Sequence, residues 1–171
     1  SARGRPGGAI ERTPPMSSNI FSCMRVDHPV LCKQLRADLS LGPELVEEVL
    51  RFRFGATIDR KVAQDTAGFG PGMKAGQVVV AWIGAANRDE SHFTRADVFD
   101  IHRPGNQQHM TFGAGPHFCL GAPLARLEAN IALASFVRRF PDIQQADGFN
   151  LDEHLTVSAT GQSLKSLTIE L

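Results

Sequence analysis

The chain has 171 residues, enough for one domain with a hydrophobic core. Its 18 basic and 18 acidic side chains cancel, which argues against nucleic acid or a membrane surface as a partner. Three cysteines are too few for a disulfide framework and no apolar run is long enough to span a bilayer, so a cytoplasmic protein is expected.

The local patterns indicate a single region over residues 1–171 that is mainly α with small β-sheets. Its expected parts are a flexible start at 1–8, a helical part at 9–54, strands and a meander at 55–118, a cysteine loop and long helix at 119–140, and C-terminal strands at 141–171. Apolar spacing predicts one helix over 29–38 and another from Pro43, with an apolar stripe of Leu45, Val46, Val49 and Leu50.

The second half of the chain alternates between extended and helical patterns. Residues 78–83 read Val-Val-Val-Ala-Trp-Ile, an apolar run that predicts a buried strand. Residues 87–108 show no sustained period and predict an ordered meander. Residues 122–140 are apolar on more than one face, which predicts a helix deep in a large core. Beyond them we expect a hairpin tip at 159–162 and a closing strand at 164–171.

Cys119 lies directly before this long predicted helix, in the stretch Thr-Phe-Gly-Ala-Gly-Pro-His-Phe-Cys-Leu-Gly. A cysteine at a helix N-terminus faces free backbone N–H groups and the positive end of the helix dipole, which favour the thiolate. The loop also has glycines that let a flat, bulky group approach and phenylalanines that can screen the sulfur from water: Gly113, Gly115, Gly121, Phe112 and Phe118. These features are the parts of a haem-thiolate site.

Other interpretations of the loop lack a necessary residue. A dinucleotide-binding fingerprint needs a third glycine where Phe118 stands. A zinc site could use His117 and Cys119, but no second Cys or His pair follows at ligand spacing. The structural alternative is that Cys119 is a buried small hydrophobic residue.

The pattern Phe-x-x-Gly-x-His-x-Cys-x-Gly, followed by Ala-Pro-Leu-Ala-Arg-Leu-Glu, closely resembles the haem-binding loop of bacterial soluble cytochromes P450. Glu48-x-x-Arg51 resembles the family's Glu-x-x-Arg helix, where the two residues form a structural ion pair. Residues 84–89 resemble its short helix and 93–100 its meander. The resemblance implies the C-terminal part of a cytochrome P450-like fold, lacking the N-terminal half.

The resemblance implies roles for individual residues around a bound haem b. Cys119 corresponds to the proximal iron ligand and Phe112 to the residue that shields the thiolate. The residues expected to contact the haem or its propionates are Cys119, Phe112, Gly113, His109, His117, Gly121 and either Arg60 or Lys61, since neighbouring residues of a strand face opposite sides. Those expected to line the substrate pocket are Ala56, Thr57, Ile58 and Thr160.

Two departures from the family pattern concern polar residues. Val98 stands where the family often has an arginine that completes the Glu-x-x-Arg network, and either Arg95 or Arg103 is the expected substitute. In the stretch that resembles the oxygen-activating part of the family, Glu11 keeps the acid, but the threonine is displaced by one position to Thr13. Glu11 and Thr13 are therefore the candidate catalytic residues for proton delivery.

The implied activity is that of a haem-thiolate monooxygenase, which inserts one oxygen atom into a small apolar substrate. A ferredoxin-type electron donor is expected near the Cys119 loop, facing Arg126, Arg138 and Arg139. Because family members are far longer, a second chain is a candidate for covering an exposed face, and activity of this chain alone is left open. The alternative is a truncated, non-catalytic protein that acts as a structural or interaction module or a haem sensor.

Overall fold

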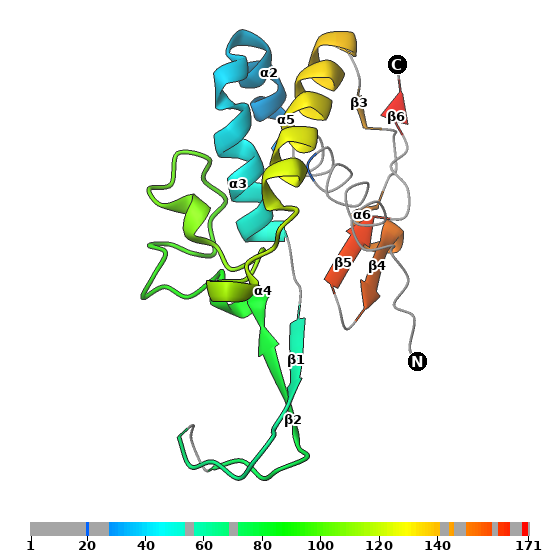
Figure 1. The fold of residues 1–171 in the computed structure, drawn as a ribbon. Helices are drawn as coiled ribbons and strands as arrows, with labels where there is room; N and C mark the ends of the chain where they lie inside the picture. The colour runs from blue at the N-terminus through cyan, green and yellow to red at the C-terminus, as the bar shows by residue number, and fades with distance from the viewer. Residues whose placement is uncertain are drawn as a thin grey trace.

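The computed structural model describes residues 20, 28–53, 57–68, 72–140, 144–145, 150–158, 161–164 and 169–170. Three longer helices pack together, namely α2 (Pro29–Ala37), α3 (Gly42–Arg53) and α5 (Ala122–Arg139), while β1 (Thr57–Lys61) and β2 (Val78–Trp82) form a hairpin that extends away from them (Figure 1). The short elements are η2 (Leu39–Leu41), α4 (Ile83–Ala86), η3 (Asn106–Gln108), η4 (Gly115–His117), β3 (Gln144–Gln145), α6 (Leu151–His154), β4 (Leu155–Ser158), β5 (Gly161–Leu164) and β6 (Ile169–Glu170). The described part is thus helical with small two-stranded sheets, as predicted.

Helices α2 and α3 form where the sequence predicts them. Pro29 begins α2, since its fixed φ suits the first helical turn, and the extended backbone of Asp38 ends it. The Asp38 carboxylate accepts a hydrogen bond from the Ser40 amide at 2.9 Å and so starts η2. In α3 the acidic Glu44 lies in the first turn, which suits the helix dipole. The predicted stripe of Leu45, Val46, Val49 and Leu50 is fully buried.

The core lies between α2, α3 and α5. Its buried residues are Ile20, Leu31, Cys32, Leu35, Leu45, Val46, Val49, Leu50, Ile101, Ala129, Leu133 and Val137. The predicted helix over 122–140 is confirmed as α5, but the prediction that it is buried all round is wrong. A second apolar face is more than half exposed at Leu124, Leu127 and Ile131. The reason is that α2 and α3 pack on one side of α5, and no segment within the described ranges packs on the other.

The β1–β2 hairpin corrects a second prediction of burial. β2 is a strand as predicted, pairing antiparallel with β1 from Thr57–Trp82 to Lys61–Val78, but all five of its residues are exposed. Trp82 is 69% exposed. An apolar run signals a strand, but it cannot tell which segment covers the strand. In the part of the chain that the structure describes, nothing covers this hairpin (Figure 1).

The C-terminal part consists of short strands, as predicted. β4 ends at Ser158 and β5 begins at Gly161, and these two residues pair antiparallel. Gly161 and Gln162 of the predicted hairpin tip therefore belong to a strand, while residues 159–160 lie outside the described residues. β6 pairs with β3, and residues 165–168 of the predicted closing strand lie outside the described residues. The turn of helix α6 before β4 was not predicted. Among the described helices, none combines the length and the hydrophobicity needed to cross a membrane.

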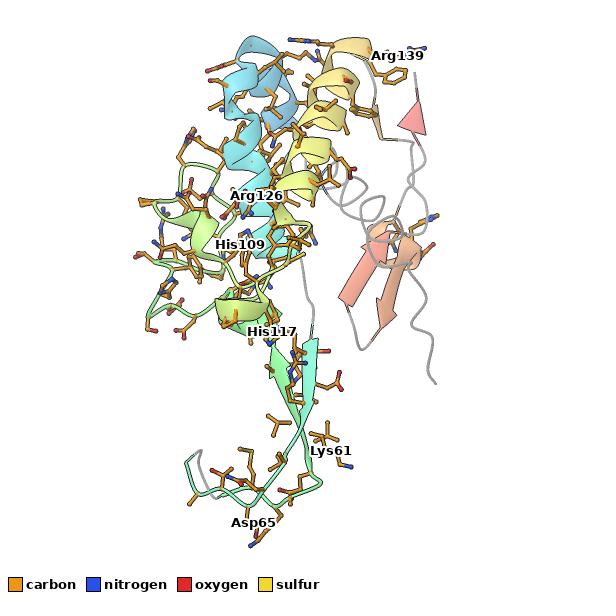
Figure 2. All side chains as sticks on the ribbon, in the orientation of Figure 1. Lys61, Asp65, His109, His117, Arg126 and Arg139 are labelled. Atoms are coloured by element: carbon orange, nitrogen blue, oxygen red, sulfur yellow. The ribbon has the colours of Figure 1, made fainter. Side chains whose placement is uncertain are left out.

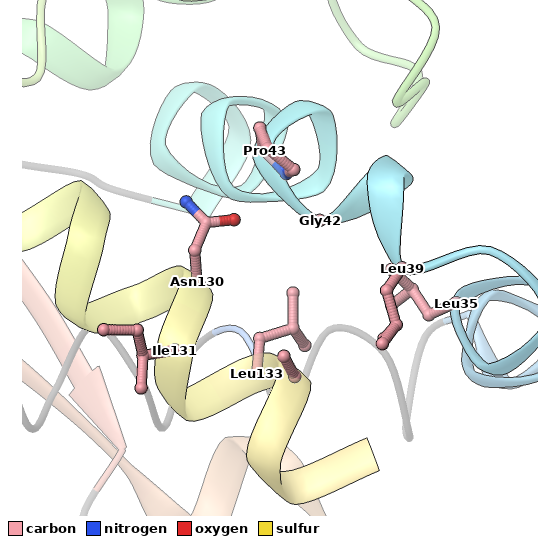
Figure 3. Close-up of a pocket in the computed structure, with 8 residues that line it drawn as sticks. Leu35, Leu39, Gly42, Pro43, Asn130, Ile131 and Leu133 are labelled. Carbon is pink, nitrogen blue, oxygen red and sulfur yellow. The ribbon is translucent and has the colours of Figure 1, made fainter. Parts of the chain in front are cut away.

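A pocket of about 300 Å³ opens between the start of α3 and the second half of α5 (Figure 3). Its lining is apolar apart from Asn130, and comprises Leu35, Leu39, Gly42, Pro43, Asn130, Ile131, Leu133 and Ala134. A Cβ at Gly42 would lie 3.2 Å from the Asn130 side-chain oxygen, so a larger residue there would require the Asn130 side chain to shift. None of the residues predicted to bind a ligand lines this pocket.

Candidate functional site

The predicted ion pair between Glu48 and Arg51 is present at the centre of the molecule. Both side chains are fully buried on α3, and the i, i+3 spacing places them on one face of the helix. Arg51 Nε and Nη2 donate to the two oxygens of Glu48 at 2.9 and 2.8 Å. A bidentate pair of this kind holds the planar guanidinium in a single orientation.

Arg51 also joins α3 to the chain that follows α4. Its Nη1 donates to the carbonyl oxygens of Asn87 and Ala96 at 2.7 and 2.9 Å, and its Nη2 donates to that of Val98 at 3.2 Å. The Asp100 amide donates to Glu48 Oε1 at 2.9 Å. The buried pair therefore positions the meander by binding its backbone.

Arg103 is the residue that completes this network. Its Nε lies 3.4 Å from Glu48 Oε1, and its two terminal nitrogens donate to the carbonyls of Thr94, Arg95 and Val98. The alternative, Arg95, is exposed and lies 3.6 Å from Asp100. Of the two substitutes that the sequence left open, the structure selects Arg103.

Asn87 connects the network to the loop that carries Cys119. Its side chain is fully buried, with Oδ1 accepting from the Met110 amide at 2.7 Å and Nδ2 donating to Thr111 Oγ1 at 3.0 Å. The Thr111 hydroxyl in turn donates to the carbonyl of Leu50 in α3 at 2.7 Å. This role of Asn87 was not predicted. The available signal was a polar residue directly after an apolar strand and short helix.

Replacing Asn87 with alanine should lower the free energy of unfolding by about 1–3 kcal/mol, because the part-buried Met110 amide loses its acceptor and Thr111 loses a donor. Urea denaturation followed by circular dichroism measures the change. Gln107→Ala, at an exposed position of η3, is the matched control and should change stability by less than about 0.5 kcal/mol. Equal stability of the two variants would contradict the connecting role.

A second cluster joins α3, the start of the loop and α5. Glu47 Oε2 lies 3.2 Å from His109 Nε2, and Arg126 donates to the same carboxylate through Nε at 2.5 Å and Nη2 at 2.9 Å. Burial alone raises the pKa of Glu47, but hydrogen bonds from Arg126 and His109, with their charges, outweigh it and lower the pKa to about 2. Glu47 is therefore ionised at neutral pH. It was not among the predicted site residues.

The Cys119 loop, residues 111–121, follows shortly after His109 of this cluster. The Arg126 guanidinium carbon lies 4.7 Å from the centre of the Phe112 ring. The Phe112 ring is also in edge contact with the Phe118 ring, and the two ring centres are 6.4 Å apart. The Cys119 amide donates to the Phe112 carbonyl at 2.9 Å. Cys119 itself is exposed, and α5 begins at Ala122 as predicted.

The loop presents an open, largely apolar surface around the sulfur. Gly113 and Gly115 have φ values of +76° and +69°, and a Cβ at either would meet no atom within 4 Å. Phe118 is 47% exposed and Leu120 97% exposed. Within the described ranges no group of three or more His, Cys, Asp or Glu side chains could hold a metal ion.

Four predicted site residues belong to β1 rather than to this loop. Thr57, Ile58, Arg60 and Lys61 are on β1, and Figure 2 shows Lys61 on the hairpin, away from His109 and His117. Arg60 donates to the Asp59 carbonyl at 2.7 Å, and both it and Lys61 are exposed, so the choice between them stays open. Glu11, Thr13, Ala56 and Thr160 lie outside the described residues.

His109 and the arginines have partners other than those expected. His109 is buried, and its ring nitrogens face Glu47 and the Thr111 amide rather than an open site. His117 is exposed at the end of η4. Arg126 is paired with Glu47, whereas Arg138 and Arg139 lie at the opposite end of α5 (Figure 2). The three arginines therefore do not form one positive patch beside Cys119.

The family model described as Cytochrome P450 matches residues 21–160 of the chain. Among curated proteins, the chain is similar to Cytochrome P450(MEG) of Priestia megaterium, with 47% identity over 96% of this chain and 40% of that protein. It is also similar to Cytochrome P450(BM-1) of the same species, with 48% identity over 94% of this chain and 40% of that protein. The chain thus spans about 40% of the length of these relatives.

Solved structures agree with this similarity. CYP109E1 from Bacillus megaterium in complex with testosterone matches with a TM-score of 0.86 and 39% identity, over 95% of this chain and 44% of that one. CYP109B1 from Bacillus subtilis matches with a TM-score of 0.83 and 40% identity, over 94% and 43%. Fold, sequence and the geometry of the cysteine loop lead to one conclusion: the chain belongs to the cytochrome P450 family.

Proposed function

We propose that this chain is the part of a cytochrome P450 monooxygenase that holds haem b, with the Cys119 thiolate as the iron ligand. The observation that carries the proposal is an exposed cysteine on an open, apolar loop whose backbone is fixed from α3. When bound, haem supplies the chemistry that activates dioxygen for insertion into a substrate. A carbon monoxide absorption spectrum, followed by a turnover assay, distinguishes this proposal from the alternative of a non-catalytic module or haem sensor.

The residues of the chain have separate tasks in this proposal. Cys119 provides the ligand, and Phe112 and Phe118, whose rings are in edge contact, would screen the sulfur from water once haem covers the loop. Gly113 and Gly115, which leave open space where side chains would be, allow a flat ring to approach the backbone. Of the two histidines predicted to contact a propionate, His117 is exposed in the same loop and is the better candidate, since His109 is buried.

The substrate and the electron donor belong to the whole protein. Among the similar solved structures, CYP109E1 is in complex with corticosterone or with testosterone, which supports a small apolar substrate here. A ferredoxin-type donor and a second chain over the exposed apolar face stay predictions, as do proton delivery by Glu11 and Thr13 and a cytoplasmic location. Arg126 is paired with Glu47 and Arg138 and Arg139 lie in the last turn of α5, so these three arginines do not form one patch for the donor.

The test is the absorption spectrum of the chain after incubation with haem, reduction and addition of carbon monoxide. Wild type should show the red-shifted Soret band of a thiolate ligand, and Cys119→Ala should lose it completely. Cys32→Ala is the matched control, because Cys32 lies buried in the core, and this variant should keep the band. Absence of haem binding in wild type would contradict the proposal and favour a structural or interaction module. A thiolate band without turnover of substrate with a surrogate electron donor would favour a haem sensor.

A further inference from the structure

Glu47 binds residues on both sides of Cys119 with a single carboxylate. His109 precedes Cys119 in the chain and Arg126 follows it, yet both contact Glu47 of α3 at 3.2 Å or less. We infer that Glu47 is a positioning residue that fixes both ends of the Cys119 loop on helix α3. The consequence for haem ligation rests on the function proposed above.

Glu47 and its two partners, His109 and Arg126, form an arrangement that we call the clamp. Its His109 side has a defined orientation. His109 Nδ1 accepts a hydrogen bond from the Thr111 amide at 3.2 Å, so in the neutral ring the proton is on Nε2. Nε2 then donates to Glu47 at 3.2 Å. The His109 side chain is fully buried. Its ring therefore links the α3 carboxylate to the backbone that leads into Phe112.

The Arg126 side reaches the cysteine through Phe112. Glu47 holds the guanidinium by two hydrogen bonds, and the guanidinium lies against the Phe112 ring at 4.7 Å. Phe112 also contacts the His109 ring, with ring centres 5.8 Å apart. Its carbonyl accepts the Cys119 amide at 2.9 Å. Both sides of the clamp thus meet at the residue that binds the Cys119 backbone.

A carboxylate is required at position 47 because every group that faces it is a donor. The Glu47 side chain is only 13% exposed, so water cannot readily replace either partner. A glutamine has one acceptor oxygen, and its NH₂ group would face an N–H group of His109 or Arg126. Glu47→Gln therefore keeps one side of the clamp at most, while preserving the size of the side chain.

The first measurement is amide hydrogen exchange of the chain without haem, read over residues 109–126. Loss of a charge-assisted hydrogen bond should raise the equilibrium fraction of locally open molecules about tenfold or more. In Glu47→Gln we therefore expect the Cys119 amide to exchange at least about tenfold faster, with α2 unchanged. The matched control is Glu44→Gln on the same helix, where the exposed carboxylate lies 3.3 Å from His102, and it should exchange as wild type does.

The second measurement is the carbon monoxide spectrum after addition of haem. The clamp predicts a smaller thiolate-ligated fraction in Glu47→Gln than in Glu44→Gln, although neither variant alters Cys119. Should Glu47→Gln fail to fold, Arg126→Lys tests one side alone: it keeps the charge but loses the bidentate geometry, and should loosen the same loop. Unchanged exchange over 109–126 in the folded variant, or an equal increase throughout the chain, would overturn the inference. If no variant binds haem, the proposed function fails, while hydrogen exchange still decides the clamp.

Discussion

Replacing Arg51 with alanine should lower the free energy of unfolding by about 3–5 kcal/mol, because it leaves the Glu48 carboxylate in the interior without its main partner. The same change removes five hydrogen bonds, two to Glu48 and three to the backbone of the meander. A domain of this size is stable by roughly 5–15 kcal/mol in total, so the variant should unfold at a much lower urea concentration. Circular dichroism during urea titration measures this shift.

Two comparisons make the Arg51 experiment specific. Arg36→Ala removes the same side chain from an exposed position in α2 and should change stability by less than about 0.5 kcal/mol. Arg51→Lys keeps the charge but cannot reach both Glu48 oxygens and the three carbonyls, so it should also be strongly destabilised. A loss of less than about 1 kcal/mol in Arg51→Ala would mean that Arg103 alone satisfies Glu48, contrary to this prediction.

The second large loss of stability is expected from a substitution in the hydrophobic core between α2, α3 and α5. Leu133 of α5 is 1% exposed and lies among the buried residues of α2 and α3. Leu133→Ala removes this contact and leaves a cavity, and should lower the free energy of unfolding by about 2–5 kcal/mol. The measurement is again urea denaturation.

Leu127→Ala on the same helix is the matched control. Leu127 is 57% exposed, so its truncation should change stability by less than about 0.5 kcal/mol. The Leu127 side chain lies next to Leu124 and Ile131 on the exposed apolar face for which a second chain is the candidate cover. Equal losses of stability at Leu127 and Leu133 would show that both faces of α5 are covered in solution.

The sequence by itself determined the features that depend on neighbouring residues. Helix positions followed from apolar spacing and from Pro29, and the Glu48–Arg51 ion pair followed from the resemblance of Glu48-x-x-Arg51 to the family's Glu-x-x-Arg helix. The cysteine loop before α5 was also predicted, because glycines and a following helix are local signals. These features need no knowledge of what packs against them.

The tertiary structure decided the features that join distant segments. The Glu47–Arg126 pair, the choice of Arg103 over Arg95 and the contacts of Asn87 all depend on how α3 meets the loop and α5. The exposure of β2 and of the second face of α5 depends likewise on which segments cover them. A residue type and its spacing show that a side chain is apolar or charged, but its partner is set by packing between parts of the chain that the sequence does not place together.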